Sequence, residues 1–418
     1  MKIRIKRGSI GGTIFAPSSK SFTQRYVLYS AFSNKSVRLN NISFSEDEII
    51  SMKIAEKCNA VIEYDRKNMH IVPDFLCPEN IYVGESGTSY RLSIGLLCSR
   101  KCRTSINGEA SLARRPVDTL IMALSDAGSR FNKKEDGFYS VDGQRATSIP
   151  VEIDGSISSQ YVSSMLFYYS ILGGGSFRAI NTVSRDYLKI TESCLANFGV
   201  KVENNDGMYQ IINHNYLEKT VDIEGDYSSA SYFIVLGIFT GNIIIKNLNY
   251  MSLQPDRKIL DLVNNATGSI KYGSAGIEIR KADHINRITV DAAVSPDMAP
   301  VISVVGIFSE EGVQIYNYKR LMAKESDRFN GIVNMCRSFG ADVTVNDSCI
   351  KIKKGRNLCP DYIEYSDHRM TMSSIIAGVI AGSNTEFGKC ESINKSYPEF
   401  LNDLKKIGVD IYFDANLF

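Results

Sequence analysis

One pattern recurs six times along the chain, and this repeat restricts the possible folds more than any other feature of the sequence. In each copy, a polar stretch rich in serine or aspartate leads into an apolar segment of helical length that ends near glycine or asparagine. Six serines mark equivalent positions, at successive spacings of 67, 73, 70, 66 and 71 residues: Ser19, Ser86, Ser159, Ser229, Ser295 and Ser366. Such regular spacing predicts six copies of one supersecondary unit.

The residues after each apolar helix predict the rest of the unit. A short strand comes first, as at 313–318, followed by a second helix in which apolar residues recur every three or four positions, as at 185–199. Two alternating strands around an asparagine or aspartate turn then predict a hairpin, as at 200–213. We therefore expect each unit to be αβαββ, with the nearly apolar first helix buried and the amphipathic second helix outside it.

The sixth copy is incomplete, because a single strand at 409–413 stands where the other copies have a hairpin. The alternating segment 2–7 has no partner nearby in the sequence and is the natural replacement. The sequence thus predicts an α/β fold with two similar domains of three units each, and 418 residues are too many for one compact core. One domain would comprise residues 1–18 plus 226–418, and the other residues 19–225, with the active site in the cleft between them.

Charge and composition argue against several classes of protein. Lys and Arg number 48 against 46 Asp and Glu, so no overall field attracts nucleic acid or a membrane surface. The most apolar stretch, 231–245, is interrupted by Gly, Thr and Asn and is shorter than the roughly 20 residues of a membrane span. Nine cysteines without a C-x-x-C pair predict reduced thiols in the cytoplasm, and the N-terminus lacks the pattern of a signal peptide.

The polar starts of the apolar helices predict anion binding. A helix N-terminus offers free N–H groups and the positive end of the helix dipole, which favour phosphate and carboxylate. Cations are disfavoured there, yet Lys20 and Arg25 lie in the first turns of the first helix. Taken alone, each cluster is better explained as a serine N-cap with exposed basic residues. The recurrence of Lys, Arg or Ser at this place in nearly every copy instead favours a site for more than one anionic group.

The later copies supply the other candidates. In the second copy, Gly87 permits close backbone approach to an anion, and Arg115 precedes Pro116 at the predicted start of an outer helix. In the fifth copy, Asp297 is either an N-cap or a base. The fourth copy has no cation at the equivalent position. Further candidates at the helix starts are Ser21, Asp47, Arg91, Ser158, Ser159, Gln160, Ser184, Tyr187, Lys324, Glu325, Arg328, Asp367, Arg369 and Lys395.

Ten short motifs, in order along nearly the whole chain, resemble the family of 5-enolpyruvylshikimate-3-phosphate synthases. They are "PSSKSFTQR", "GESGTSYR", "RRP", "SSQY", "SRDY", "EGDYSSASYF", "PDMAP", "KESDR", "SDHRM" and "KSYPEF". The resemblance implies the inside-out α/β barrel of the enolpyruvyl transferases, with two domains that close over the substrates. It also implies transfer of the enolpyruvyl group of phosphoenolpyruvate to the 5-hydroxyl of shikimate 3-phosphate, in aromatic amino acid biosynthesis. We expect a cytoplasmic monomer that uses no metal and no organic cofactor.

Carried over position by position, the resemblance implies a role for each candidate. The residues implied to contact shikimate 3-phosphate are Lys20, Ser21, Arg25, Ser158, Ser159, Gln160, Ser184, Tyr187, Asp297 and Lys324. The residues implied to contact phosphoenolpyruvate are Lys20, Gly87, Arg115, Gln160, Arg328, Arg369 and Lys395. Asp297 is implied to take the 5-hydroxyl proton. Glu325 is implied to protonate the vinyl carbon, with Lys20 as a competing or assisting acid.

The sequence departs from the family pattern at three positions, and there are two rival interpretations of its function. Ser18 stands where many members have Gly, and Glu85 and Arg320 stand where many have Asn. Glu85 is expected either to repel phosphoenolpyruvate or to pair with a neighbouring arginine.

One rival interpretation is an enolpyruvyl transferase that acts on UDP-N-acetylglucosamine. It is disfavoured because the loop before Arg114 lacks cysteine and Lys20 is not followed by Asn. The other is an RNA-phosphate-cyclase-like protein, which the near-neutral charge disfavours.

Overall fold

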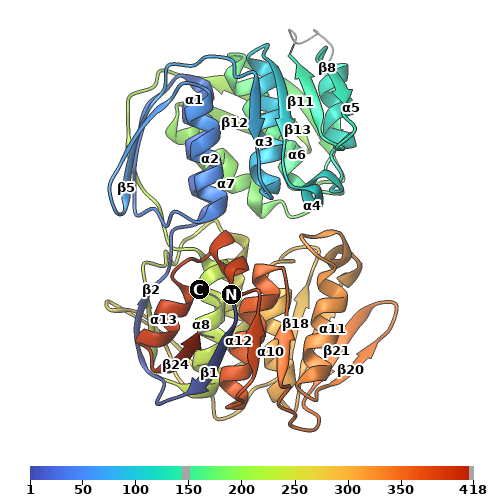
Figure 1. Cartoon of the computed structure of the whole chain (residues 1–418). Coiled ribbons are helices and arrows are strands. Elements are labelled where there is room, and N and C mark those ends of the chain that lie inside the picture. Colours follow the sequence, from blue (N-terminus) through green and yellow to red (C-terminus); the bar gives the residue numbers. More distant parts are fainter. Residues whose placement is uncertain (144–150, 414–418) are drawn as a thin grey trace. The chain divides into compact units, whose positions relative to one another are not determined.

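The computed structural model describes residues 1–143 and 151–413, which divide into two compact units. The N-terminal unit is Ser18–Ile223, and the C-terminal unit joins Met1–Pro17 to Glu224–Phe418. These bounds lie within two residues of those expected from the repeat. Within the described residues the strands form six four-stranded sheets, three in each unit (Figure 1).

The N-terminal unit contains three repeats of inner helix, outer helix and sheet. Its inner helices are α1 (Lys20–Ser33), α3 (Gly87–Ser99) and α6 (Ser159–Ile171). Its other helices are α2 (Glu46–Lys57), α4 (Ala110–Ala113), α5 (Asp118–Asp126) and α7 (Asp186–Asn197). Its strands are β3 (Val37–Asn40), β4 (Val61–Tyr64), β5 (Asn68–Val72), β6 (Asn80–Tyr82), β7 (Arg103–Asn107), β8 (Arg130–Lys133), β9 (Tyr139–Asp142), β10 (Val151–Asp154), β11 (Gly174–Ile180), β12 (Val200–Asn205), β13 (Met208–Asn213) and β14 (Thr220–Asp222).

The C-terminal unit follows the same plan. Its inner helices are α8 (Tyr227–Thr240), α10 (Ala299–Phe308) and α12 (His368–Ala381). Its other helices are α9 (Lys258–Thr267), α11 (Arg328–Ser338), α13 (Phe400–Lys406) and the 3-10 turns η1 (Pro255–Arg257), η2 (Tyr318–Ala323) and η3 (Cys390–Lys395). Its strands are β1 (Ile3–Arg7), β2 (Gly12–Phe15), β15 (Ile243–Lys246), β16 (Ile270–Gly273), β17 (Gly276–Ile279), β18 (Ile288–Asp291), β19 (Val313–Tyr316), β20 (Asp342–Val345), β21 (Cys349–Lys353), β22 (Tyr362–Glu364), β23 (Glu386–Gly388) and β24 (Val409–Phe413).

The repeat has one more strand than the sequence predicted. A short strand precedes each inner helix, and in four of the six sheets it pairs in parallel with the strand after that helix, as β6 pairs with β7 and β18 with β19. The expected αβαββ unit is therefore βαβαββ. These extra strands have only three or four residues, which is too short for an alternating pattern to be recognised in the sequence.

Two of these extra strands pair outside the repeat in which they occur. β2 precedes α1 but pairs with β15 of the C-terminal unit, and β14 precedes α8 but pairs with β3 of the N-terminal unit. β1 pairs with both β23 and β24, in the place that a second hairpin strand has in the other sheets. The chain therefore returns to complete each unit with a strand that is distant in sequence.

Each unit has its own core, built around its inner helices. α1, α3 and α6 pack together in one unit, and α8, α10 and α12 in the other (Figure 1). All six are buried along most of their length. α8 and α10 are largely apolar on all sides, whereas α1 also buries Gln24 and Arg25. Outer helices bury one face, as α9 does with Ile259, Leu260, Val263 and Ala266. None of the helices in the described part of the chain is both long and apolar enough to cross a membrane.

The cysteines differ from the sequence expectation at one pair. Cys77 and Cys102 form a disulfide, whereas reduced thiols were expected throughout. The two residues precede β6 and β7, and the parallel pairing of these strands brings their Cα atoms to 5.3 Å. A separation of 25 residues gives no local signal of this contact. The other seven cysteines are free thiols.

Candidate active site

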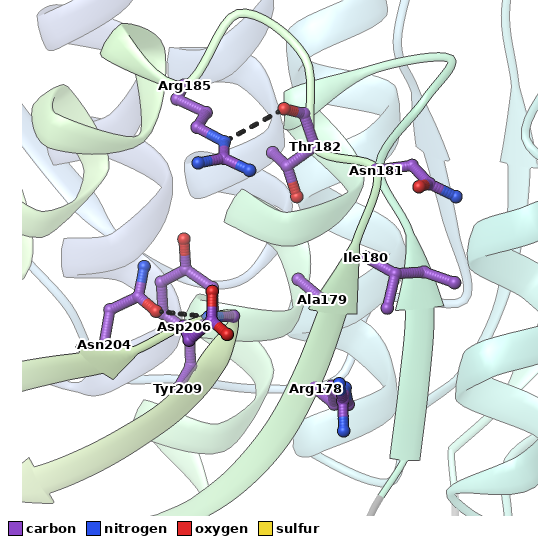
Figure 2. Close-up of a pocket in the computed structure, with 10 residues that line it drawn as sticks. Arg178, Ala179, Ile180, Asn181, Thr182, Arg185, Asn204, Asp206 and Tyr209 are labelled. Carbon is purple, nitrogen blue, oxygen red and sulfur yellow. Dashed lines mark hydrogen bonds between the residues drawn. The ribbon is translucent and has the colours of Figure 1, made fainter.

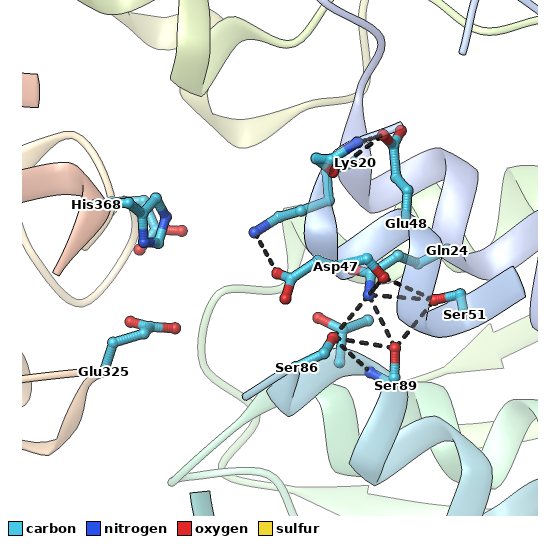
Figure 3. A network of polar contacts seen from close by, with 12 residues as sticks. Lys20, Gln24, Asp47, Glu48, Ser51, Ser86, Ser89, Glu325 and His368 are labelled. Carbon is cyan, nitrogen blue, oxygen red and sulfur yellow. Dashed lines mark hydrogen bonds and ion pairs between the residues drawn. The ribbon is translucent and has the colours of Figure 1, made fainter. Parts of the chain in front are cut away.

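The N-termini of the three inner helices of the N-terminal unit lie together. Gln24, in the second turn of α1, contacts the Ser86 and Ser89 hydroxyls at the start of α3, with Nε2–Oγ distances of 2.8 and 3.0 Å (Figure 3). Gln160, in the first turn of α6, donates to the Thr88 hydroxyl at 2.9 Å. Three positive helix ends are therefore adjacent, which is the arrangement expected of an anion site.

Two cations of α1 lie at this end of the unit. Lys20 Nζ is 2.7 Å from a carboxylate oxygen of Asp47, which lies in the first turn of α2 (Figure 3). Arg25 is almost fully buried and donates to the Thr191 hydroxyl and the Ser21 carbonyl, both at 2.8 Å. Burial lowers the pKa of Arg25 to about 10, so the guanidinium is charged at neutral pH. Because these partners are neutral oxygens, the charge of Arg25 can still attract an anion.

A second group of predicted residues surrounds the start of α3. Arg91 donates from Nη1 to the Gln160 side-chain oxygen at 2.8 Å and from Nη2 to the Pro116 carbonyl at 3.4 Å. A Cβ atom on Gly87 would lie 2.8 Å from Nη1 of Arg115 and 3.3 Å from Nη1 of Arg91. The two guanidinium groups can approach the helix this closely only because residue 87 is glycine. The structure thus brings together three predicted phosphoenolpyruvate contacts: Gly87, Arg115 and Gln160.

The predicted shikimate 3-phosphate contacts of α6 and α7 lie beside α1. Ser158 is the N-cap of α6, and its hydroxyl accepts a hydrogen bond from the backbone N–H of Gln160 at 3.2 Å; Ser159 begins the helix. Ser184 precedes α7 with φ of 48°, and Tyr187 in the first turn interacts electrostatically with Arg25. These residues therefore belong to the same end of the unit as the cations of α1.

A polar pocket lies beside Thr182 and Arg185, which flank Ser184 in the sequence. Its volume is about 410 Å³, and its lining includes Arg178, Thr182, Arg185 and Tyr209. Arg185 donates to the Thr182 carbonyl at 3.2 Å, and the tip of the β12–β13 hairpin closes the opposite wall (Figure 2). The ten residues that line it include none of the predicted substrate contacts.

In the C-terminal unit, Arg328 is the centre of the candidate site. Its side chain is fully buried and contacts carboxylate oxygens of Asp297 at 2.6 Å, Glu325 at 2.5 Å and Asp367 at 2.8 Å. These carboxylates come from the turn before α10, the loop before α11 and the N-cap of α12. One guanidinium group therefore holds the starts of three helices together.

Asp297 lies between two arginines and is not the N-cap of α10. Arg369 contacts its second oxygen at 2.9 Å. Burial would raise the pKa of Asp297, but the positive charges of Arg369, Arg328 and Lys324 outweigh it and hold the pKa well below the ordinary range. Burial lowers the pKa of Lys324 to about 8, although Asp297 and Glu325 oppose this. Three cations and one carboxylate that were predicted from the sequence thus surround Asp297.

Four predicted residues lie outside the helices in which the sequence placed them. α5 begins at Asp118, so Arg115 lies in the turn after α4 and not in the first turn of the outer helix. α11 begins at Arg328 because Asp327 accepts a hydrogen bond from the Asn330 N–H and caps it, which leaves Glu325 and Lys324 in a loop. Lys395 ends η3, which packs on α12, and does not open α13.

The comparisons with known proteins cover nearly the whole chain. Residues 5–404 match the model of the family described as EPSP synthase (3-phosphoshikimate 1-carboxyvinyltransferase). The chain is 46% identical over 409 residues to the 3-phosphoshikimate 1-carboxyvinyltransferase of Picrophilus torridus, covering 98% of this chain and 99% of that protein. It is 30% identical to the protein of that name from Clostridium acetobutylicum, covering 98% of each chain.

The chain belongs to the EPSP synthase family.

Solved structures agree with this membership at the level of the fold. The EPSP synthase of Acinetobacter baumannii superposes with a TM-score of 0.81 at 21% identity, covering 99% of this chain and 100% of that one. The enolpyruvyl transferase NikO of Streptomyces tendae superposes with a TM-score of 0.77 at 14% identity, covering 98% of each chain. The predicted α/β fold of two similar domains is therefore confirmed.

Each departure from the EPSP synthase pattern has a polar partner in its own unit. Glu85 accepts a hydrogen bond from the Ser111 hydroxyl at 2.8 Å. Arg320 donates to the Ala293 carbonyl at 2.7 Å. Ser18 donates to the buried carboxylate of Glu48 at 3.0 Å. The Glu85 carboxylate is therefore held beside α4 by a neutral hydroxyl, a partner that the sequence did not predict.

Sequence analysis of this EPSP synthase family member missed two buried polar residues. Gln24 links α1, α2 and α3 through its side-chain amide, and Asp256 approaches the start of α8 through a hydrogen bond from Ser228. Gln24 lies in the motif "PSSKSFTQR", one helical turn after Lys20, and this spacing could have identified it as a site residue. Asp256 follows a proline in the fourth copy, where no cation drew attention to it.

Proposed function

We propose that this protein transfers the enolpyruvyl group of phosphoenolpyruvate to the 5-hydroxyl of shikimate 3-phosphate and releases phosphate. The observation that carries the proposal is the clustering of basic side chains at the inner-helix starts of each unit. Arg25, Arg91 and Arg115 lie in one unit, and Arg328 and Arg369 lie in the other. Two substrates that each carry a phosphate need such groups, and the family relationship supports this choice of substrates.

We assign the binding contacts as the family resemblance implies. Shikimate 3-phosphate would contact the hydroxyl and amide groups at the starts of α6 and α7, together with Arg25 and Lys324. Phosphoenolpyruvate would contact Arg115 and the backbone at Gly87 from one unit, and Arg328, Arg369 and Lys395 from the other. Charged hydrogen bonds of this kind are stronger in a site from which water is excluded. Because each unit supplies only part of this set, we propose that both units act on the same pair of substrates.

The proposed mechanism has three proton transfers. Asp297 takes the proton of the 5-hydroxyl as its oxygen bonds to the central carbon of phosphoenolpyruvate, and Glu325 or Lys20 gives a proton to the vinyl carbon. Breaking the bond between that central carbon and the phosphate oxygen releases phosphate. A proton returns from the new methyl group to the side chain that donated it, which restores the double bond. Arg328 orients both carboxylates, since it contacts Asp297 and Glu325 directly. The arginines stabilise the charge that develops on the phosphate.

Phosphate release from phosphoenolpyruvate in the presence of shikimate 3-phosphate tests the function. We expect turnover that requires both substrates, and Asp297→Ala and Glu325→Gln should lose most of the rate while shikimate 3-phosphate still binds. Asp291→Ala is a matched control, because Asp291 is an exposed aspartate at the end of β18 in the same unit. Turnover with UDP-N-acetylglucosamine in place of shikimate 3-phosphate would overturn the substrate assignment. Full activity in either site variant would remove the role given to that residue.

We also propose an oligomeric state and a cellular location for the protein. We propose that it acts as a monomer, because every candidate residue comes from one chain. Light scattering after size-exclusion chromatography tests this, and a dimer mass would overturn it. A cytoplasmic location is proposed from the reaction class, and cell fractionation tests it.

A further inference from the structure

Asp256 lies among the candidate residues of the C-terminal unit and has no role in the scheme above. It is 1% exposed and belongs to η1. Its Oδ2 atom accepts a hydrogen bond from the Ser228 hydroxyl in the first turn of α8. Its Oδ1 atom is buried and has no hydrogen-bond partner among the residues that the structure describes. A buried carboxyl with an unsatisfied oxygen is costly and needs an explanation beyond the stability of the fold.

The charged neighbours of Asp256 come from three different elements. They are Asp297 before α10, Arg369 in the first turn of α12, and Asp226, the N-cap of α8. Arg369 also contacts Asp297 at 2.9 Å. Arg369 therefore pairs with Asp297 and is within electrostatic range of Asp256, so the positive charge that it can present to a substrate depends on whether Asp256 is ionised.

We propose that Asp256 is a positioning residue that sets how strongly Arg369 holds an anionic substrate. When the Asp256 carboxyl is neutral, the carboxylate of Asp297, 2.9 Å from Arg369, competes for the charge of Arg369. When Asp256 is ionised, a second negative charge competes with the substrate. This inference rests on the proposed assignment of Arg369 to phosphoenolpyruvate, and it adds a residue that acts through Arg369 without contacting the reacting atoms.

The protonation of Asp256 changes in the range where the enzyme would work. Burial and the negative charge of Asp297 raise the pKa of Asp256 to about 7, although Arg369 and the Ser228 hydrogen bond oppose this rise. The carboxyl is therefore neutral below that pH and ionised above it. An anion bound to Arg369 would favour the neutral form further, so substrate binding above pH 7 should take up a proton. Affinity for phosphoenolpyruvate should fall as the pH rises.

Asp256→Asn, which keeps the shape of the side chain and removes its charge, tests the proposal. We would measure KM for phosphoenolpyruvate of the wild type and of the variant from pH 5.5 to 8.5. The ratio of wild-type KM to variant KM should be near one at pH 5.5 and on the order of ten at pH 8.5, since one pKa unit of interaction is a tenfold effect. Ionisation of the substrate and of Lys324 occurs in both proteins and cancels in the ratio. A ratio that is constant across this range overturns the proposal.

Ser228→Ala gives an independent test if Asp256→Asn does not fold. The variant loses the hydrogen bond that lowers the pKa of Asp256, so the rise in KM should begin at a higher pH than in the wild type. An unchanged profile or a shift to lower pH would contradict the proposal. Loss of stability alone would not move the pH at which KM changes.

Arg369→Met separates failure of this inference from failure of the site assignment. If Arg369→Met leaves KM for phosphoenolpyruvate unchanged, the assignment of Arg369 is wrong and the inference fails with it. If Arg369→Met raises KM at every pH but the Asp256→Asn ratio stays constant, the role of Asp256 alone is wrong.

Discussion

Adding a methyl group at residue 87 tests whether the position of the Arg115 guanidinium, beside the start of α3, matters for substrate binding. The added Cβ of Gly87→Ala would lie 2.8 Å from Nη1 of Arg115 and 3.3 Å from its Cζ, whereas ordinary contact begins near 3.4 Å. The nearest atoms belong to the far end of a flexible side chain, so we expect the Arg115 guanidinium to move by about 0.6 Å or more while α3 stays in place. Because a misplacement of about 1 Å can cost on the order of a hundredfold, we expect KM for phosphoenolpyruvate to rise about tenfold.

Steady-state phosphate release at varied phosphoenolpyruvate gives this KM directly. KM for shikimate 3-phosphate should change less than about twofold, because its assigned contacts lie on other helix starts. Gly273→Ala is the matched control, since its Cβ would meet only the Gly276 carbonyl oxygen, at 3.8 Å, and should leave both KM values unchanged. A Gly87→Ala enzyme with the wild-type KM for phosphoenolpyruvate would refute the reasoning, because Arg115 could then be displaced without consequence.

Three other predictions concern buried charge, pH and the thiols. Arg328→Met leaves three carboxylates without their common cation, so the free energy of unfolding should fall by about 3–5 kcal/mol in urea titrations followed by circular dichroism; the exposed Arg287→Met should change it by less than about 1 kcal/mol. Because the pKa of Lys324 is about 8, the wild-type KM for shikimate 3-phosphate should rise severalfold between pH 7 and 9, and Lys324→Arg, which stays charged, should flatten this rise. Equal pH profiles of KM in the two proteins would argue against a contact between Lys324 and shikimate 3-phosphate. Alkylation of the unfolded chain should label seven thiols without reductant and nine after reduction, and nine labels without reductant would disprove the Cys77–Cys102 bond.

Local patterns in the sequence predicted the helices of this protein well. The apolar segments around Tyr232 and Val304 are buried inner helices, because a helix that is apolar on every face is stable only inside a core. The serine and aspartate stretches mark helix starts, since Ser158, Asp226 and Asp367 all cap helices through their side chains.

Short strands and helix boundaries were predicted less well. The strands before the inner helices contain three or four residues and give no alternating signal, so β6 and β18 were missed. The start of α11 was misplaced because the sequence around it offers several acidic caps, and only the hydrogen bond between Asp327 and the Asn330 N–H selects one.

Periodicity and motifs within short segments predicted the sixfold repeat, the α/β class and the candidate residues. Which of these residues lie together depends on how the helices pack. The tertiary structure joins Arg328 to Asp367, 39 residues away, and Arg369 to Asp297, 72 residues away, and it brings Asp256 within electrostatic range of Asp297 and Arg369. Contacts of this kind arise from the packing of whole helices, so no local pattern records them, and they set the charge of each group in the site.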